Sequence, residues 1–225
     1  GNKVLTGNSC GGKYEKCIEP LQYLYSDRTL SAEIIPGKSV IGIAVDPENR
    51  LAVAIDYIMT TGWGGYGIDI PTLENTPSSG AGIYVRGERD SYLIRDGKAN
   101  TAKILAYGRS NGISYPAAEA AYNYQPGSCS SSSWCGRGNW YLPSNWQVFP
   151  YFDNRATIHL MLKAINKMPD DWWYTRNDFY TVTSNEINAK ESGFIYINTG
   201  GMAHGGKNLT EPDNLQTLVL PYITY

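Results

Sequence analysis

The clearest pattern in the sequence is a pair of apolar, β-branched runs separated by a short polar turn. Residues 40–57 read VIGIAVDPENRLAVAIDY. Pro47 presets the backbone angle that a turn needs, and Asn49 tolerates a left-handed conformation. Strand-sized runs on either side of such a turn predict a β-hairpin. Residues 21–25, LQYLY, predict a short strand before it.

Helical patterns follow in the middle of the chain. Residues 114–124, SYPAAEAAYNY, predict a short helix with Pro116 in its first turn, where a missing N–H does no harm. Farther along, Ser144 and Gln147 match an S-x-x-Q capping box, which marks a helix start. Pro150 is expected to interrupt or kink that helix.

A second helix is expected directly after this proline. An apolar stripe at helical spacing, with a cap at Asn154, predicts a helix that extends to Asn166. His159 lies within it, where a packed or surface histidine is favoured over a ligand.

The other patterns are strands and loops. Residues 179–185, 193–198 and 215–225 have strand patterns, whereas residues 60–100 predict loops with short strands and residues 199–214 predict polar, glycine-rich loops. Strands, then helices, then strands again predict an α+β fold.

Composition points to contact surfaces without deciding between two interpretations. The chain has 18 Tyr, 6 Trp and 24 Gly but only 4 Phe. Tyrosine and tryptophan suit both half-wet sheet faces and binding surfaces, so a glycine-rich β protein and a dedicated binding surface both remain open. The 19 basic and 21 acidic residues nearly balance. Nucleic acid is therefore not an expected partner, because its binders carry a basic excess.

The four cysteines form two close pairs, Cys10 with Cys17 and Cys129 with Cys135. An even number at short spacing favours two local disulfides and an oxidising compartment. A zinc site is the alternative, but neither pair is C-x-x-C and the chain has only two histidines. The predicted location is extracellular or at the cell surface.

The sequence contains no apolar run of the roughly 20 residues that cross a bilayer. Nor does it begin with a signal peptide. If the protein is exported, we expect this chain to be a mature or truncated form, with any membrane anchor in a segment before Gly1.

Candidate chemistry is sparse. Glu211-Pro212-Asp213-Asn214 is similar to a calcium-binding triplet of animal lectins, but a polar turn is favoured because the partner residues come in the wrong order. Cys135 with His204 could form a nucleophile and base, although Cys135 has a disulfide partner nearby. Asp170 and Asp171 beside two tryptophans could suggest a glycosidase, but they more often mark a helix end. No enzyme and no cofactor are expected, and a structural calcium ion remains open.

A short motif adds a resemblance to a known family. Residues 138–147, GNWYLPSNWQ, resemble the Gly-x-Trp-x-Leu-Pro-[Ser/Thr]-x-x-Glu run of secreted bacterial C-type-lectin-like domains. These include the C-terminal domain of the collagen-like adhesin Lcl and the Fibrobacter major paralogous domains. The resemblance implies that Trp140 and Leu142 enter the core and that Ser144 caps a helix, with Gln147 replacing the family's acid.

The resemblance covers most of the chain from about residue 21. It implies one C-type-lectin-like domain over residues 21–225, with small antiparallel sheets, a few helices and long loops, preceded by a disulfide-clipped arm at 1–20. The family's tryptophan and closing arginine are replaced here by Thr181 and Leu220, which predicts a looser core near the C-terminus. No calcium ligand carries over.

In this family the loops between the last strands form the usual contact face, so the resemblance implies a ligand site there. Aromatic, amide and charged side chains in these loops are typical of recognition rather than catalysis. The candidate ligand-binding residues are Trp172, Trp173, Tyr174, Arg176, Asn177, Asp178, Asn185, Glu186, Asn188, His204, Lys207, Asn208 and Asp213. The two tryptophans could instead pack against the sheet.

The first functional hypothesis is a secreted or surface-attached bacterial recognition module that binds a glycan or protein on another cell or matrix. Such a module could be an adhesin, a pilus-tip or minor-pilin head, or a variable protein diversified by a retroelement. The second hypothesis is a structural subunit of a filament or cell envelope, which contacts neighbouring subunits. An enzyme, such as a glycan hydrolase or a relative of formylglycine-generating enzymes, is the third; free thiols would favour it.

Overall fold

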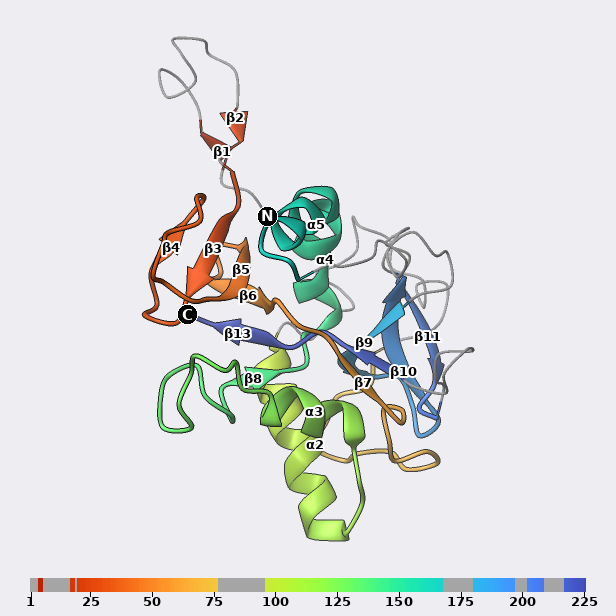
Figure 1. Cartoon of the computed structure of the whole chain (residues 1–225). Coiled ribbons are helices and arrows are strands. Elements are labelled where there is room, and N and C mark those ends of the chain that lie inside the picture. The colour runs from red at the N-terminus through yellow and green to blue at the C-terminus, as the bar shows by residue number, and fades with distance from the viewer. Residues whose placement is uncertain are drawn as a thin grey trace.

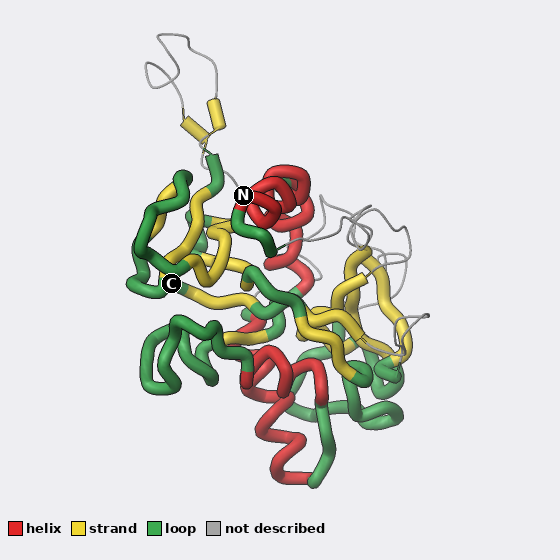
Figure 2. The backbone as a smooth tube through the Cα atoms, viewed as in Figure 1, coloured by secondary structure: helices red, strands yellow, loops and turns green. Residues whose placement is uncertain are grey.

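The computed structural model describes residues 20–76, 96–167, 180–196, 202–208 and 217–225, and the backbone alone of residues 4–5 and 17–18. Within these residues the chain forms an α+β fold, which confirms the predicted class. Figure 1 shows the two larger sheets side by side, with one pair of helices above the junction between them and a second pair below it. Figure 2 shows that loops make up much of the remaining backbone.

A 6-stranded antiparallel sheet contains the predicted hairpin. The turn between its two strands differs in one detail from the sequence prediction, since Arg50, with φ of 55°, takes the left-handed conformation rather than Asn49. The strands lie in the order β4-β3-β5-β6-β13-β8. Their bounds are β3 Gln22–Tyr25, β4 Leu30–Ser31, β5 Val40–Asp46, β6 Leu51–Ala54, β8 Trp140–Tyr141 and β13 Tyr222–Thr224.

A 5-stranded sheet lies beside it in the order β11-β10-β9-β12-β7. Only the pairing of β12 with β9 is parallel among its described ladders. β11 lies in a segment for which the sequence predicted a loop. The bounds are β7 Ile58–Thr60, β9 Tyr180–Glu186, β10 Glu191–Tyr196, β11 Met202–Gly206 and β12 Thr217–Val219. A third, 2-stranded sheet pairs β1 (Val4–Leu5) with β2 (Cys17–Ile18).

A two-stranded ribbon joins the two larger sheets. One side consists of β6 and β7, and the other of β12 and β13, which run antiparallel to them. The register of the β7–β12 pairing differs by two residues from that of the β6–β13 pairing, and the change occurs near Asp56. The Asp56 carboxylate accepts hydrogen bonds from the Tyr124 hydroxyl at 2.9 Å and from Lys167 Nζ at 3.0 Å. These contacts fix the bend at which the chain leaves one sheet and enters the next.

Helix α2 (Gly97–Asn111) was not predicted, whereas α3 (Pro116–Asn123), with proline in its first turn, confirms a prediction. Glycine and polar residues conceal α2 in the sequence. Gly108 packs against the next segment, where a Cβ would lie 2.7 Å from the Ile113 carbonyl oxygen. Gly112 caps the helix with φ of 66°, a conformation that costs glycine little. Gly108 therefore allows close packing of this helix, and Gly112 ends it, so neither glycine interrupts it.

Helix α4 (Asn145–Asp153) begins with the predicted capping box. Ser144 accepts a hydrogen bond from the Gln147 amide, and the Gln147 side chain accepts one from the Ser144 amide at 2.9 Å. Pro150 lies inside the helix and does not interrupt it, so of the two expected effects only a kink stays a prediction. Gln147 completes the cap at a position where the family that the sequence resembles carries an acid.

Helix α5 (Arg155–Ala164) follows as predicted, but Asn154 does not cap it through its side chain. The side-chain amide of Asn154 instead donates to the Pro150 carbonyl oxygen at 2.8 Å. His159 is buried and lies 3.0 Å from the Tyr151 hydroxyl. It is therefore a packed histidine, one of the two alternatives favoured from the sequence.

The 6-stranded sheet is covered on both faces. Tyr23 and Tyr25 of β3 pack toward α4 and α5, whereas Leu24 packs toward the opposite cluster. This opposite cluster contains Trp140, which is 1% exposed as the family resemblance implied. Burial of both faces explains why the central strands are apolar throughout rather than alternating.

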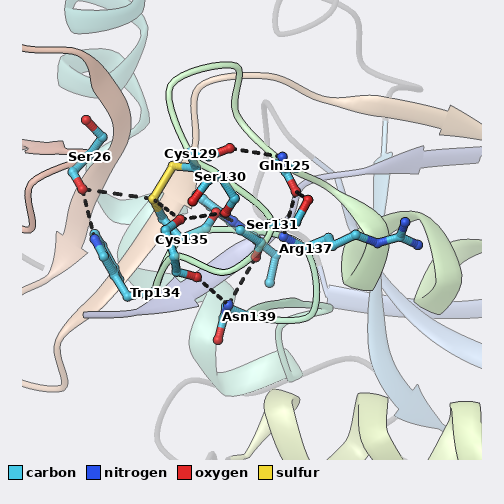
Figure 3. The surroundings of a disulfide bond; sticks show 12 residues. Ser26, Gln125, Cys129, Ser130, Ser131, Trp134, Cys135, Arg137 and Asn139 are labelled. Atoms are coloured by element: carbon cyan, nitrogen blue, oxygen red, sulfur yellow. Dashed lines mark hydrogen bonds between the residues drawn. A yellow bond between two sulfur atoms is a disulfide. The ribbon is translucent and has the colours of Figure 1, made fainter.

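The disulfide between Cys129 and Cys135 is present, and it holds a loop over the second face of this sheet. Figure 3 shows the loop tied to the sheet by the Trp134 indole N–H, which donates to the Ser26 carbonyl oxygen at 2.9 Å. The Trp140 indole donates to the Cys135 carbonyl oxygen at 2.8 Å. Cys10 lies outside the described residues, so its pairing with Cys17 stays a prediction.

Candidate binding basin

A glycine-rich loop, residues 61–70, approaches the ends of β9 and β11 at one end of the 5-stranded sheet. Gly65 has φ of 64°, and a Cβ there would lie 2.4 Å from Cε1 of Tyr115. Gly64 has φ of 101°, and a Cβ there would lie 2.5 Å from the Ser114 carbonyl oxygen. The loop can follow this path only because these positions lack side chains.

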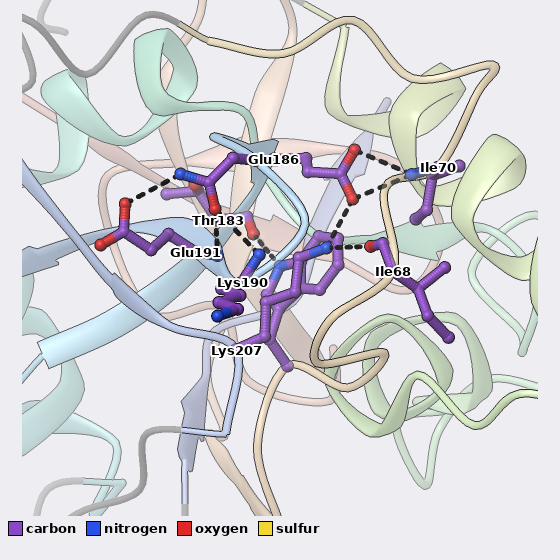
Figure 4. Close-up of polar contacts among 9 residues, drawn as sticks. Ile68, Ile70, Thr183, Glu186, Lys190, Glu191 and Lys207 are labelled. Atoms are coloured by element: carbon purple, nitrogen blue, oxygen red, sulfur yellow. Dashed lines mark hydrogen bonds and ion pairs between the residues drawn. The ribbon is translucent and has the colours of Figure 1, made fainter.

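A buried ion pair fastens this loop to the sheet. Figure 4 shows Lys207, just after β11, directed at Glu186 at the end of β9. Nζ of Lys207 lies 2.6 Å from Oε2 of Glu186, and both side chains are 0% exposed. The same Nζ donates to the Ile68 carbonyl oxygen at 2.7 Å, and the Glu186 carboxylate accepts from the Ile70 amide at 3.1 Å. Two sheet residues thereby bind the backbone of the loop.

Trp63 encloses the pair on one side. The Lys207 ammonium lies 5.0 Å from the centre of the Trp63 ring, within the range of a cation–π contact. The Trp63 indole N–H donates to the Thr183 carbonyl oxygen at 2.8 Å, and the Trp63 amide donates to the Lys207 carbonyl oxygen at 2.9 Å. The Lys207 ammonium is therefore held by the Glu186 carboxylate, the Ile68 carbonyl oxygen and the Trp63 ring.

Burial raises the pKa of the Glu186 carboxyl to about 7. The hydrogen bond and positive charge of Lys207, with the Ile70 amide, oppose this rise, whereas the Asp69 side chain adds to it. Desolvation disfavours the charged carboxylate, and the partner charge favours it. The net direction is upward, so the protonation state of this carboxyl is sensitive to pH near neutrality.

Beside the ion pair, a shallow basin of about 370 Å³ opens to solvent. It is lined by Tyr66, Asn188, Lys190, Glu191, Gly206 and Asn208. Tyr66 comes from the glycine-rich loop and is 52% exposed. The name basin is used from here on for these six lining residues and the space between them. Its mixture of an aromatic ring, amides and both charges is suited to binding polar groups.

The turn between β9 and β10 gives the basin a fixed wall. Oδ1 of Asn188 accepts from the Lys190 and Glu191 amides at 2.8 and 2.9 Å, and its amide donates to the Glu191 carboxylate at 3.1 Å. His204 on β11 brings Nδ1 to 3.1 Å from the same carboxylate. Asn188 therefore shapes the basin, while the exposed side chains of Tyr66 and Asn208 remain available to a ligand.

The sequence-predicted site residues thus divide into three groups. Asn188 and Asn208 line the basin, and His204 contacts its Glu191 wall. Asn185, Glu186 and Lys207 were placed on a contact face, but the structure buries all three. The remaining seven candidates lie outside the described residues: Trp172, Trp173, Tyr174, Arg176, Asn177, Asp178 and Asp213.

The burial of Asn185, Glu186 and Lys207 has a physical reason. Asn185 accepts a hydrogen bond from the Asn145 amide at 2.8 Å and donates one to the Thr76 hydroxyl at 2.8 Å, and the other two form the ion pair. None of these three side chains lines the basin. The ion pair contributes to it indirectly, by holding the loop that carries Tyr66. Tyr66 was not among the sequence-predicted site residues, although its position between glycines in WGGYG was a usable signal.

The described residues restrict the other chemistry considered from the sequence. Cys135 is in a disulfide, so it is neither a free nucleophile nor a zinc ligand. The described residues contain no group of three or more acidic, histidine or cysteine side chains that could hold a metal ion. In the same part of the chain, no helix has the length and apolar character required to cross a membrane.

Comparison with solved structures finds a likeness of fold. The chain resembles the crystal structure of a fimbrial protein from Bacteroides ovatus, with a TM-score of 0.58 and 15% sequence identity. The likeness covers 91% of this chain, which spans about half, 48%, of the length of that structure. No family model matches the chain. A search of curated proteins found no match.

Proposed function

We propose that this chain is a non-enzymatic, surface-exposed domain of a bacterial fimbrial protein, and that its basin binds polar groups of a glycan or protein ligand. The observation that carries the proposal is the basin itself, an open surface built on a buried ion pair and bordered by Tyr66 and Asn208. The fold likeness to a fimbrial protein supports the cellular setting.

The basin has the features of a preorganised recognition surface. The Glu186–Lys207 pair and the Asn188 turn fix its walls before a ligand arrives, which lowers the entropic cost of binding. The exposed ring of Tyr66 supplies contact area with few rotatable bonds. The C-type-lectin-like assignment belongs to the same proposal, because core residues Trp140 and Leu142 and the Ser144 cap occupy the roles that the resemblance implied.

The test is binding of the whole chain to an array of glycans and host-matrix proteins, with calcium and again with a chelator. Tyr66→Ala and Asn208→Ala should abolish specific signals at the basin. Tyr57→Ala is the matched control, because Tyr57 is 38% exposed and lies outside the basin. Binding that both basin variants leave at full strength for every array ligand, or a lack of any specific signal, would exclude this proposal.

A second function, a structural subunit of a filament, is favoured by the same fimbrial likeness. A subunit would form assemblies whose size rises with protein concentration in the absence of any added ligand. Light scattering and electron microscopy of the purified chain over a concentration series distinguish the two. A chain that stays monomeric throughout and binds an array ligand supports the recognition function.

A further inference from the structure

A cleft separate from the basin lies between helices α2 and α3, at the bottom of the view in Figure 1. Its volume is about 460 Å³, within the range typical of small-molecule sites. One continuous segment of the chain supplies its whole lining. The residues that matter most are Leu105, Arg109, Ile113, Glu119, Tyr122 and Asn123.

The cleft is a fixed feature of the fold. The chain leaves α2 at Gly112 and turns back, so that the Ile113 amide donates to the Gly108 carbonyl oxygen at 2.9 Å. Tyr115 is fully buried beneath, with its ring edge-to-face on Trp63 at 5.7 Å. Gly108 allows this close return, because a Cβ there would lie 2.7 Å from the Ile113 carbonyl oxygen and 2.9 Å from the Tyr115 ring.

The lining combines an aromatic ring with a free positive charge. Tyr122 is 40% exposed. Arg109 is exposed, and no acidic residue in the described part of the chain forms an ion pair with it. An unpaired guanidinium beside an open cleft favours a carboxylate, which it can bind through two parallel hydrogen bonds.

The opposite wall offers acceptors and donors. The Glu119 carboxylate accepts from the Tyr115 amide at 3.1 Å and from the Ser114 hydroxyl at 3.3 Å, which holds it in place with lone pairs left for a ligand. Asn123 accepts from Arg137 at 2.6 Å through Oδ1, and its NH₂ group retains its donors. This wall suits the hydroxyl groups of a sugar.

From this arrangement we infer that the α2–α3 cleft binds an acidic pyranoside. The carboxylate of the ligand pairs with Arg109, its ring lies against Tyr122, and its hydroxyls contact Glu119 and Asn123. The ligand class follows from the charge of Arg109, which has no acidic partner among the described residues, together with the aromatic and hydroxyl-binding groups of the cleft. The site is independent of the basin, since the two share no lining residue.

The test is a titration of the whole chain with D-glucuronic acid, with D-glucose as the uncharged comparison, followed by NMR chemical shifts and calorimetry. Arg109→Gln should weaken glucuronic acid binding about 10- to 100-fold, the effect of losing a charge-assisted hydrogen bond. Lys103→Gln, on the same helix but outside the cleft, is the matched charge control and should leave binding unchanged. Tyr122→Ala should weaken binding of both sugars, and Tyr66→Ala should weaken neither.

Each of the following results would overturn the inference: no saturable binding of glucuronic acid, equal affinity for the two sugars, or binding that persists in Arg109→Gln. Loss of binding in Tyr66→Ala with retention in Tyr122→Ala would also overturn it, because the sugar would then occupy the basin. Thermal melting of each variant confirms that a loss of binding is not a loss of folding.

Discussion

Nζ of Lys207 and the carboxylate of Glu186 lie 2.6 Å apart at a place where neither side chain has any exposed surface. Removal of one partner leaves the other charge buried and uncompensated, which typically costs about 3–5 kcal/mol. We therefore expect Lys207→Met to lower the free energy of unfolding by about 3 kcal/mol at pH 8. Urea denaturation measures this loss.

The double variant Glu186→Gln/Lys207→Met is the control for that experiment. It removes both charges, while the glutamine oxygen can still accept the hydrogen bond from the Ile70 amide. We expect it to recover most of the lost stability. A double variant as unstable as the Lys207→Met single variant would show that the pair does not act as a coupled unit.

The raised pKa of the Glu186 carboxyl predicts that the stability of the fold depends on pH. Its pKa is about 7 in the folded chain, whereas the ordinary pKa of a glutamate carboxyl is 4.5. Between these values the folded chain holds a proton that the unfolded chain has released, so stability falls as pH rises through this window. The stabilisation from the protonated Glu186 is complete below the ordinary pKa of 4.5 and is lost above the folded-state pKa of about 7.

Glu186→Gln has no titrating group at this position. We expect the free energy of unfolding of the native chain, measured relative to this variant, to decline between about pH 5 and pH 7. Denaturation at a series of pH values measures the difference. Parallel curves for the two proteins would contradict the upward direction of the pKa shift.

The close approach of Gly65 to the Tyr115 ring predicts a selective effect of alanine. Gly65→Ala must accommodate both a positive φ and a Cβ that would lie 2.4 Å from the ring, so we expect a loss of about 2–3 kcal/mol. Gly67 also has a positive φ, of 86°, but no atom lies within 4 Å of a Cβ there. Gly67→Ala should therefore cost only about 1 kcal/mol, and equal costs would refute the clash.

The disulfide between Cys129 and Cys135 closes a short loop, with a sequence separation of 6. Loop-closure entropy for such a length stabilises the fold by about 2 kcal/mol. We expect the Cys129→Ser/Cys135→Ser variant to melt about 4–8 °C lower in calorimetry. Added reductant should produce a similar shift in the native chain but none in the variant beyond that caused by any second disulfide.

The elements that the sequence predicted correctly are those in which local chemistry and tertiary packing agree. The hairpin around Pro47 and the Ser144 cap both depend on contacts between residues close in sequence. The α2 helix was missed because Gly97 and Gly108 resemble helix breakers. Each actually permits a close contact, and a Cβ at Gly97 would lie 2.3 Å from the Leu142 carbonyl oxygen. Such a contact between distant segments has no signature in the local sequence.

The candidate site shows the same limit. Polar residues at the end of β9, such as Asn185 and Glu186, have the composition of an exposed loop, yet each is 0% exposed. Their burial is possible because partners from distant segments, Asn145, Thr76 and Lys207, satisfy their hydrogen bonds. Among the candidates that the structure describes, the amides Asn188 and Asn208 do have the surface position that their composition suggested.

The ribbon that joins the two sheets has a consequence for the kinetics of folding. Thr60 and Thr217, which face each other in it, are 157 residues apart in the chain. β12 lies between β9 and β7, and β13 between β6 and β8, so neither sheet is complete until contacts of this separation have formed. Contacts so distant in sequence raise the contact order and slow the search for the native state. We therefore expect the rate-limiting step of folding to be the docking of residues 217–224 between strands that are already in place.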